Sequence, residues 1–308
     1  MKSTYKFLII SMFTASVGCT SGSQSGQETA EAAELFPAEL VKFVPLSDSV
    51  LFQGTGSNTW DKQIRERGYI LKEGDIYKMW YTGYNYDSVK QMFLGHATSP
   101  DGLHWSRHEH NPVFSDYWTE DVHVTYVDGA YYMYAEGVGD IAHLLTSKDG
   151  ISWNRKGDLQ IFQTDGTPIS GPYGTPSLWI EDGKWRLFYE RNDTGIWVAA
   201  STDGVRWTNI QDDPVIAMGP EEYDKFGVAV NQIIKHKGRY YAYYHGTAFE
   251  DWSEWTSNVA VSEDLIHWTK YPENPVIGVD HSSPVLVHDG EQYRLYTMHS
   301  QVKVFKSE

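Results

Sequence analysis

One hairpin pattern occurs five times along this chain of 308 residues, and the repeat limits the fold more than any other feature. Each copy has two apolar-rich runs joined at a glycine turn, as in EDVHVTYVDGAYYMYAEG at 120–137. Asp-Gly between alternating runs is a strong hairpin signal. The turn glycines, spaced by 55, 54, 55 and 52 residues, are Gly74, Gly129, Gly183, Gly238 and Gly290.

Each of the first four hairpins leads to a third run that ends in a turn and a Trp, as in LLTSKDGISW at 144–153. A short apolar run follows, such as NPVFS at 111–115. Four strands in a unit of about 50 residues, without helical periodicity, are typical of a β-propeller. We therefore predict an all-β fold, a five-bladed β-propeller with four-stranded antiparallel blades.

The two ends of the repeat array complement each other. The fifth unit lacks a fourth run, whereas a spare run, SVLFQG at 49–54, precedes the first hairpin. We expect this N-terminal strand to close the ring as the outer strand of the last blade, because closure leaves no open sheet edge.

The N-terminus has the pattern of a secretory signal. Residues 1–18 contain two lysines and then an apolar run that is too short to span a membrane. Val17-Gly18-Cys19 resembles the end of a bacterial lipoprotein signal, which implies a lipid on Cys19, the only cysteine of the chain. The sequence therefore predicts a lipid-anchored protein of the bacterial cell envelope that faces the periplasm or the outside.

The remaining chain divides into two parts. Residues 19–40 are largely polar and predict a flexible tether, and residues 41–308 form one predicted propeller domain. A net charge of −16 argues against nucleic acid and anionic membrane surfaces as partners, so contact with a membrane is expected only through the lipid anchor. The 12 Trp and 21 Tyr suit an oligosaccharide partner, although aromatic residues also favour strands.

The sequence carries no signal of a cofactor. It lacks a phosphate-binding glycine loop and a metal-ligand spacing of His or Cys, so no cofactor is expected. A calcium or sodium ion in the axial channel stays open as an alternative.

Polar residues gather at one predicted end of the blades. In a propeller blade the innermost strand begins, and the second strand ends, on the same face of the ring. Residues seven or eight before each turn glycine begin the innermost strands, and residues about seven after it end the second strands. Acids, arginines, histidines and amides from different blades should therefore converge at one mouth, which is the expected site.

The inner-strand pattern resembles the five-bladed superfamily of arabinanases, levansucrases and invertases, which includes glycoside hydrolase families 43, 32, 117 and 130. YWTEDVHVTYVDGAYYMYAEG at 117–137 is most similar to the second blade of family 43. The resemblance implies that Asp121 orients and tunes the catalytic pair and that Glu66 falls at the general base. The third-blade acid of that family, two residues before a Pro, is replaced here by Gly174, so the acid must come from elsewhere on the rim.

Glycoside hydrolysis needs one protonated and one ionised carboxyl group. Glu66 lies between two arginines, which suits a base or nucleophile, although a structural salt bridge is the alternative. Glu190 has aromatic neighbours and suits the acid, with an ion pair to Arg191 as the alternative, and Glu136 is the substitute acid. The predicted substrate-binding residues are Arg65, Arg67, His123, Arg191, Asn231, Gln232, His245, Ser283 and His299.

The turns of the type S-x-D-G-x-x-W resemble the sialidase Asp-box but are one residue shorter. They repeat away from the axis, where Ser and Asp are expected to cap the turn and Trp to fill the space between blades.

The sequence thus predicts an exo-acting glycoside hydrolase that cleaves terminal sugars of plant or algal oligosaccharides with paired carboxylates at the propeller mouth. A glycoside phosphorylase similar to family 130 is one alternative, with Arg65, Arg67 and Arg191 as the basic phosphate site. A sugar-binding lipoprotein without catalysis is the other, because the usual third-blade acid position is vacant.

Overall fold

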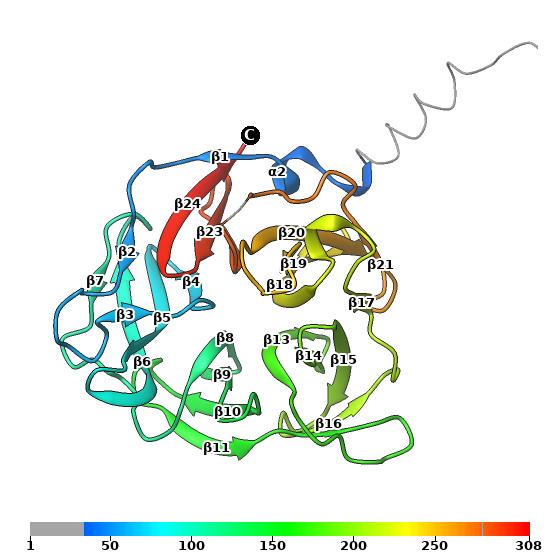
Figure 1. Ribbon diagram of the computed structural model, residues 1–308, viewed down its shortest axis with the longest axis horizontal. Coiled ribbons are helices and arrows are strands. Elements are labelled where there is room, and N and C mark those ends of the chain that lie inside the picture. The colour runs from blue at the N-terminus through cyan, green and yellow to red at the C-terminus, as the bar shows by residue number, and fades with distance from the viewer. Residues whose placement is uncertain (1–33, 279) are drawn as a thin grey trace, which may run out of the picture. The chain divides into compact units, whose positions relative to one another are not determined.

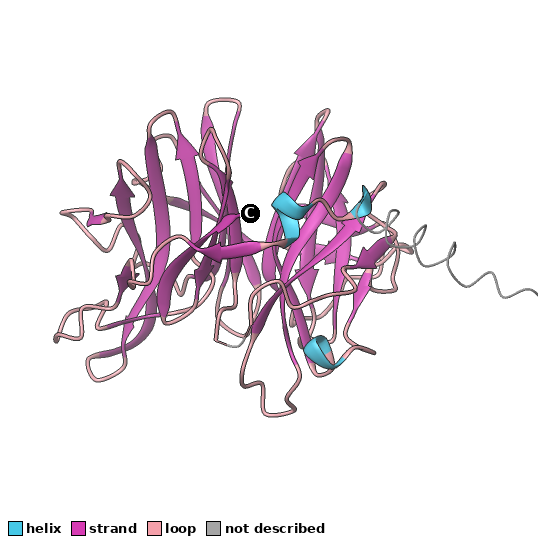
Figure 2. Cartoon of the chain, turned by 90° about the horizontal axis from the view of Figure 1, so that it is seen from above, coloured by secondary structure: helices cyan, strands magenta, loops and turns pink. Residues whose placement is uncertain are grey.

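The computed structural model describes residues 34–278 and 280–308, and its compact unit runs from Phe36 to Glu308. Five sheets with antiparallel blades surround a central axis (Figure 1), which confirms the predicted five-bladed β-propeller. Figure 2 shows the strands of the blades side by side, with turns and loops gathered at their two ends.

Each blade has four strand positions, counted outward from the axis. The first blade contains β3 (Gln63–Ile64) and β4 (Tyr69–Glu73), both paired with β5 (Ile76–Asn85), then β6 (Val89–Ser99) and β7 (Ser106–Arg107). The second contains β8 (Glu120–Val127), β9 (Ala130–Glu136), β10 (Ala142–Ser147) and β11 (Asn154–Asp158).

The third blade contains β13 (Gly174–Glu181), β14 (Lys184–Glu190), β15 (Gly195–Ser201) and β16 (Arg206–Asn209). The fourth contains β18 (Gly227–His236), β19 (Arg239–Thr247), β20 (Thr256–Ser262) and β21 (Trp268–Lys270). The fifth contains β22 (Pro284–His288), β23 (Tyr293–Met298) and β24 (Gln301–Ser307). Among the described residues, α2 (Ala38–Val41) is a short α-helix and η1 (Glu222–Asp224) a 3₁₀ helix.

The chain closes the ring with its N-terminal strands, as predicted. Strand β2 (Phe52–Gln53), within the predicted run 49–54, pairs antiparallel with β24, so the outer edge of the last blade is occupied. The sequence did not predict β1 (Phe43–Pro45), which pairs with the other end of β24.

The compact unit begins before residue 41, where the sequence placed the end of the tether. Phe36 and Leu40 are buried, and the Tyr243 hydroxyl donates a hydrogen bond of 2.7 Å to the Leu40 carbonyl. The predicted signal, Cys19 and most of the tether lie outside the described residues. In the described part of the chain, no helix is long and apolar enough to cross a membrane.

The short apolar runs were predicted as fourth strands, and this prediction is wrong. The fourth strands, β7, β11, β16 and β21, each begin within one residue of the turn Trp. Three of the four apolar runs pair with the third strand of their own blade, as β17 (Ile216–Ala217) does with β15. Strand β12 (Gln160–Phe162) instead pairs in parallel with β16 of the next blade. In the third blade, β16 and β17 thus both pair with the outer edge of β15. Periodicity in the sequence does not reveal that two short segments divide this edge.

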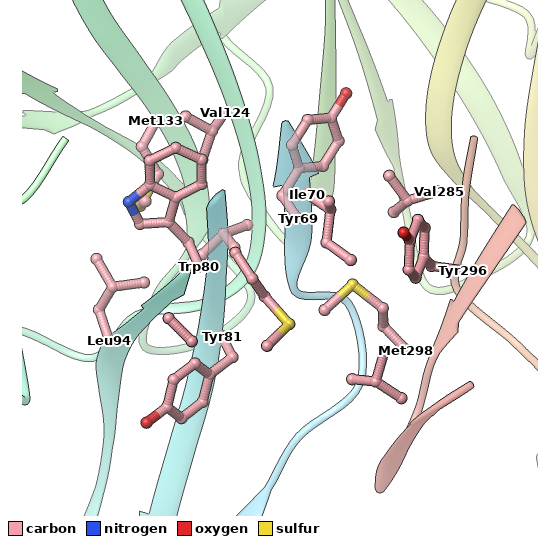
Figure 3. Close-up of a cluster of buried hydrophobic side chains, with 14 of the residues drawn as sticks. Tyr69, Ile70, Trp80, Tyr81, Leu94, Val124, Met133, Val285, Tyr296 and Met298 are labelled. Carbon is pink, nitrogen blue, oxygen red and sulfur yellow. The ribbon is translucent and has the colours of Figure 1, made fainter. Parts of the chain in front are cut away.

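Aromatic side chains pack between blades and contact the S-x-D turns. The Trp80 indole N–H donates a hydrogen bond of 2.8 Å to the carbonyl of Gly150, and the Tyr134 hydroxyl donates one of 2.9 Å to Gly204. Figure 3 shows Trp80 in the apolar cluster between the first blade and its neighbours. Within each turn the Ser hydroxyl and the Asp carboxylate accept backbone N–H bonds, as Ser147 and Asp149 do. The structure thus agrees with the capping and filling roles.

Candidate active site

A cavity of about 400 Å³ opens where the first strands begin and the second strands end. Four carboxylic acids singled out from the sequence line it together, although they come from three blades: Glu66, Asp121, Glu136 and Glu190. Five of the predicted binding residues also line it: Arg65, Arg67, His245, Ser283 and His299. The ring therefore assembles most of the predicted mouth.

In four of the five blades, a residue in the left-handed backbone region lies within two residues of the start of the innermost strand. These are Arg67 (φ 59°), Asp121 (φ 51°), Thr175 (φ 46°) and Ser283 (φ 59°). Residues other than glycine seldom adopt this conformation, and it re-aims the side chain as a β-bulge does. The same local distortion thus turns one side chain from each of these blades toward the axis.

Arg67 lies buried at the centre of the site. Its Nε is 3.3 Å from the Asp121 carboxylate, and its Nη2 donates a hydrogen bond of 2.7 Å to the carbonyl of Val230. Desolvation lowers the pKa of Arg67, while the surrounding carboxylates, Asp121 foremost, oppose that shift. Its Nη1 is buried without a hydrogen-bond partner, so a donor is left for a bound molecule.

Glu136 and Glu190 occupy the space beside Gly174. A Cβ atom at residue 174 would lie 2.1 Å from Glu136 Oε2 and 2.8 Å from Glu190 Oε1. The two oxygens are therefore less than about 5 Å apart, since both lie that close to one point. Only glycine fits here. Residue 174, to which the family resemblance assigns an acid, has no side chain here. The space that such a side chain would need is occupied by the carboxylates of Glu136 and Glu190.

Burial raises the pKa of both Glu136 and Glu190. Desolvation, with a contribution from the charge of Asp193, raises the pKa of Glu190 to about 7. Desolvation and the charges of Asp121 and other acids hold the pKa of Glu136 well above its ordinary value. Backbone N–H groups orient both carboxyls: Thr175 donates to Glu136 at 2.9 Å, and Asp193 donates to Glu190 at 2.6 Å. Burial therefore makes both carboxyls harder to ionise than an exposed glutamate.

Glu66 stands in a different environment. Its side chain is 26% exposed, and its carboxylate lies 3.0 Å from Arg65 Nη2 and 4.0 Å from His299 Nδ1. Arg65 also donates a hydrogen bond of 3.0 Å to the buried carboxylate of Glu120. Desolvation raises the pKa of Asp121 well above its ordinary value. The cavity thus combines a buried acid group with a wetter, arginine-paired carboxylate.

The wall formed by the fourth and fifth blades carries hydroxyl and imidazole groups. His245 Nδ1 lies 3.1 Å from the amide oxygen of Asn231, and its ring meets Trp255 at 4.8 Å between centroids. His299 Nδ1 lies 3.2 Å from the Ser282 hydroxyl. The buried Ser283 hydroxyl has no hydrogen-bond partner. These groups suit the hydroxyls of a sugar.

Four predicted binding residues do not line the cavity. The Gln232 amide pairs with the backbone of Leu286, at 2.7 and 3.1 Å, and joins two inner strands. His123 packs on Tyr69 at 4.4 Å, and burial lowers its pKa to about 3. Asn231 reaches the site only through His245, and Arg191 turns toward the Trp197 ring. Direct substrate contact by these four has no support from the geometry.

Several residues that line the cavity were not predicted from the sequence. Asp140, Asn192 and Asp193 come from loops that follow second strands, and Trp252 comes from the loop between β19 and β20. Desolvation raises the pKa of Asp193 to about 6. Their place in the sequence could have indicated them. Asp140 and Asp193 lie shortly after Glu136 and Glu190, where the chain leaves the second strand at the mouth. In the described residues, no group of three or more His, Cys, Asp or Glu could hold a metal ion.

The chain is similar to carbohydrate-active proteins. Residues 169–289 match the N-terminal domain of glycosyl hydrolases family 32. A 1,2-beta-oligomannan phosphorylase from Thermoanaerobacter sp. (strain X514) is 25% identical over 226 residues, which cover 67% of this chain and 72% of that protein.

Two solved structures share the fold. A β-1,2-mannobiose phosphorylase from Listeria innocua, in complex with β-1,2-mannobiose, has a TM-score of 0.66 at 15% identity and covers 86% of this chain and 95% of its own. The second structure comes from work on family 130, a family of mannoside phosphorylases that also contains glycoside hydrolases targeting β-1,2-mannosidic linkages in Candida mannan. It has a TM-score of 0.66 at 14% identity, and the match covers 86% of this chain and 93% of that one.

The predicted superfamily is confirmed, whereas none of these relatives is described as a family 43 enzyme. The chain belongs to the carbohydrate-active, five-bladed β-propeller superfamily of glycoside hydrolases and phosphorylases and is similar to families 32 and 130 rather than to family 43 in particular.

Proposed function

We propose that the protein hydrolyses a terminal glycosidic bond of a mannose-containing oligosaccharide. The observation that carries the proposal is the buried pair Glu136 and Glu190 around Gly174, in a cavity that also holds the separate carboxylate of Glu66. Cleavage of a glycosidic bond requires a proton donor and an ionised partner, and the different environments of these acids supply both.

Glu190 is the proposed acid. With a pKa raised to about 7, it holds its proton in a large fraction of molecules at neutral pH and can donate it to the leaving oxygen. Glu136 helps Glu190 to keep its proton, because two buried carboxylates within about 5 Å of each other cannot both ionise at low cost. Glu66, beside Arg65, is the proposed base that activates water.

The shape of the axial channel favours an exo mode of action. Beneath the cavity, the inner strands contribute buried side chains, among them Tyr69, His123 and Gln232, which contact one another or the neighbouring strands. A cavity closed below admits the end of a sugar chain and leaves the rest outside. The relatives named for β-1,2-mannosides make these the first substrates to test, followed by the plant and algal oligosaccharides expected from the sequence.

Phosphorolysis is the second candidate, and the relatives described as phosphorylases favour it. The unpaired donors of Arg67, in the first blade, and of Ser283, in the fifth, could hold a phosphate. The charge of the cavity favours water instead. Against two arginines, its lining contains six carboxylic acids: Glu66, Asp121, Glu136, Asp140, Glu190 and Asp193. Even with protons on the buried pair, this balance repels a phosphate dianion.

The test is incubation of the purified protein with β-1,2-mannobiose and with plant and algal oligosaccharides, with and without inorganic phosphate. Hydrolysis predicts free monosaccharide at a rate that phosphate leaves unchanged, whereas phosphorolysis predicts a sugar 1-phosphate only when phosphate is added. Glu190→Gln should abolish turnover while sugar binding survives. A protein that binds these sugars without any turnover would refute both candidates and support the sugar-binding alternative.

A further inference from the structure

We infer that Trp252 forms a stacking platform for the second sugar of the substrate, on the leaving-group side of the cavity. This inference rests on the proposed function, since it assigns the leaving group to one part of the same cavity. Trp252 lines the cavity and is 53% exposed. All twelve tryptophans lie within the described residues, and Trp252 is the only one of them that is exposed.

The loop holds this indole in place. The backbone of Trp252 is left-handed, with φ 57°, which is unfavourable for a bulky residue. Its N–H donates a hydrogen bond of 3.1 Å to the Phe249 carbonyl, and the Thr247 hydroxyl donates one to the Ser253 carbonyl. Hydrogen bonds on both sides of a strained residue indicate that the exposed position is built into the loop.

Trp255, in contrast, is a packed part of the wall. Its ring meets His245 edge to face and lies so close to Gly227 that a Cβ there would be 2.8 Å from the indole. The neighbouring Trp252 therefore remains the ring with a free face. Flat aromatic faces stack on the C–H surfaces of sugars, and an anchor of this kind adds affinity with little loss of side-chain entropy.

The arrangement of the blades assigns the platform to the leaving group. Glu190 ends β14 in the third blade, and the Trp252 loop connects β19 and β20 in the adjacent fourth blade (Figure 1). The proposed acid must lie beside the leaving oxygen. A sugar bound to that oxygen extends toward the nearby rim, where Trp252 stands.

The experiment compares mannose with β-1,2-mannobiose as probes for binding to the Glu190→Gln protein, by calorimetry and tryptophan fluorescence. Trp252→Ala should weaken mannobiose binding about 30-fold, as loss of an interface anchor does, and leave mannose binding unchanged. Phe249→Ala is the matched control, because this exposed ring belongs to the same loop but does not line the cavity. Trp252→Phe should recover most of the affinity.

The outcomes separate the platform from the proposed function. If wild-type protein cleaves mannobiose and Trp252→Ala binds it equally well, the platform is refuted and the function stands. If mannobiose binding depends on Trp252 but wild-type protein never cleaves it, the platform stands and the function falls. Equal losses for mannose and mannobiose would place Trp252 at the first sugar and would also overturn the inference.

Discussion

Replacing Glu190 by Gln should change how the stability of the protein depends on pH. Gln keeps the shape of the side chain and an oxygen that can accept the 2.6 Å hydrogen bond from the Asp193 N–H, but it never ionises. The pKa of Glu190 is raised from 4.5 to about 7, mainly by desolvation. The folded wild-type protein therefore binds a proton that the unfolded chain has already released.

The sign follows from this difference. The stabilising proton is fully bound in both states below pH 4.5, and the folded state loses its advantage as the pH rises through about 7. Because one pKa unit corresponds to about 1.4 kcal/mol, the wild-type protein should lose about 3 kcal/mol of unfolding free energy relative to Glu190→Gln between pH 4 and pH 8.

Urea denaturation at several pH values between 4 and 8 measures this difference. Other titrating groups are common to both proteins, so the comparison isolates residue 190. Glu109→Gln, which removes an exposed carboxylate outside the cavity, controls for the loss of one negative charge. Parallel stability curves for wild-type protein and Glu190→Gln would show that Glu190 is not desolvated, and the proposed acid would lose its physical basis.

Three further predictions concern the site and the stability of the propeller. Gly174→Ala should abolish turnover while the fold persists, because its Cβ would lie 2.1 Å from a carboxylate oxygen; circular dichroism and an activity assay test this. Gly204→Ala, at φ 76° and with its Cβ 2.8 Å from the Tyr134 hydroxyl, should destabilise the protein by about 1–3 kcal/mol in denaturant melts. Phe36→Ala should cost about 3 kcal/mol in the same melts if the N-terminal segment is part of the propeller, since this ring is buried.

The five-bladed architecture was predictable because the hairpin pattern repeats along the sequence. A spacing of 52 to 55 residues between turn glycines defines the blades, and counting back from each glycine locates the mouth, where Arg67, Asp121 and Ser283 lie. The count is accurate to about one residue only. Bulges between Glu120 and His123 and between Val230 and Gln232 shift the register. A shift of one residue sends a side chain to the other face of a strand, which is why His123 and Gln232 were assigned to the cavity.

Loop residues follow no period, so the sequence could not place them. Asp193 and Trp252 lie in turns whose course depends on local hydrogen bonds and left-handed residues. A comparison of equivalent positions in different blades identifies one further kind of contact, that between the aromatic residue of one blade and the turn of the next. Tyr134 donates to the Gly204 carbonyl, whereas the equivalent Phe188 lacks a donor and packs with Leu265, which stands where the other turns have glycine. Such paired changes within one chain identify neighbours that spacing alone does not.

Gly174 shows why a missing residue is weak evidence that chemistry is missing. The mouth of each blade collects residues from the start of the first strand and from the end of the second, so an acid can reach the same space from either one. Here Glu136 and Glu190 end β9 and β14, and their oxygens fill the volume that a side chain at residue 174 would need. A larger residue at 174 and this pair therefore exclude each other. The glycine is required by the acids beside it, and the argument for a sugar-binding protein without catalysis loses its main observation.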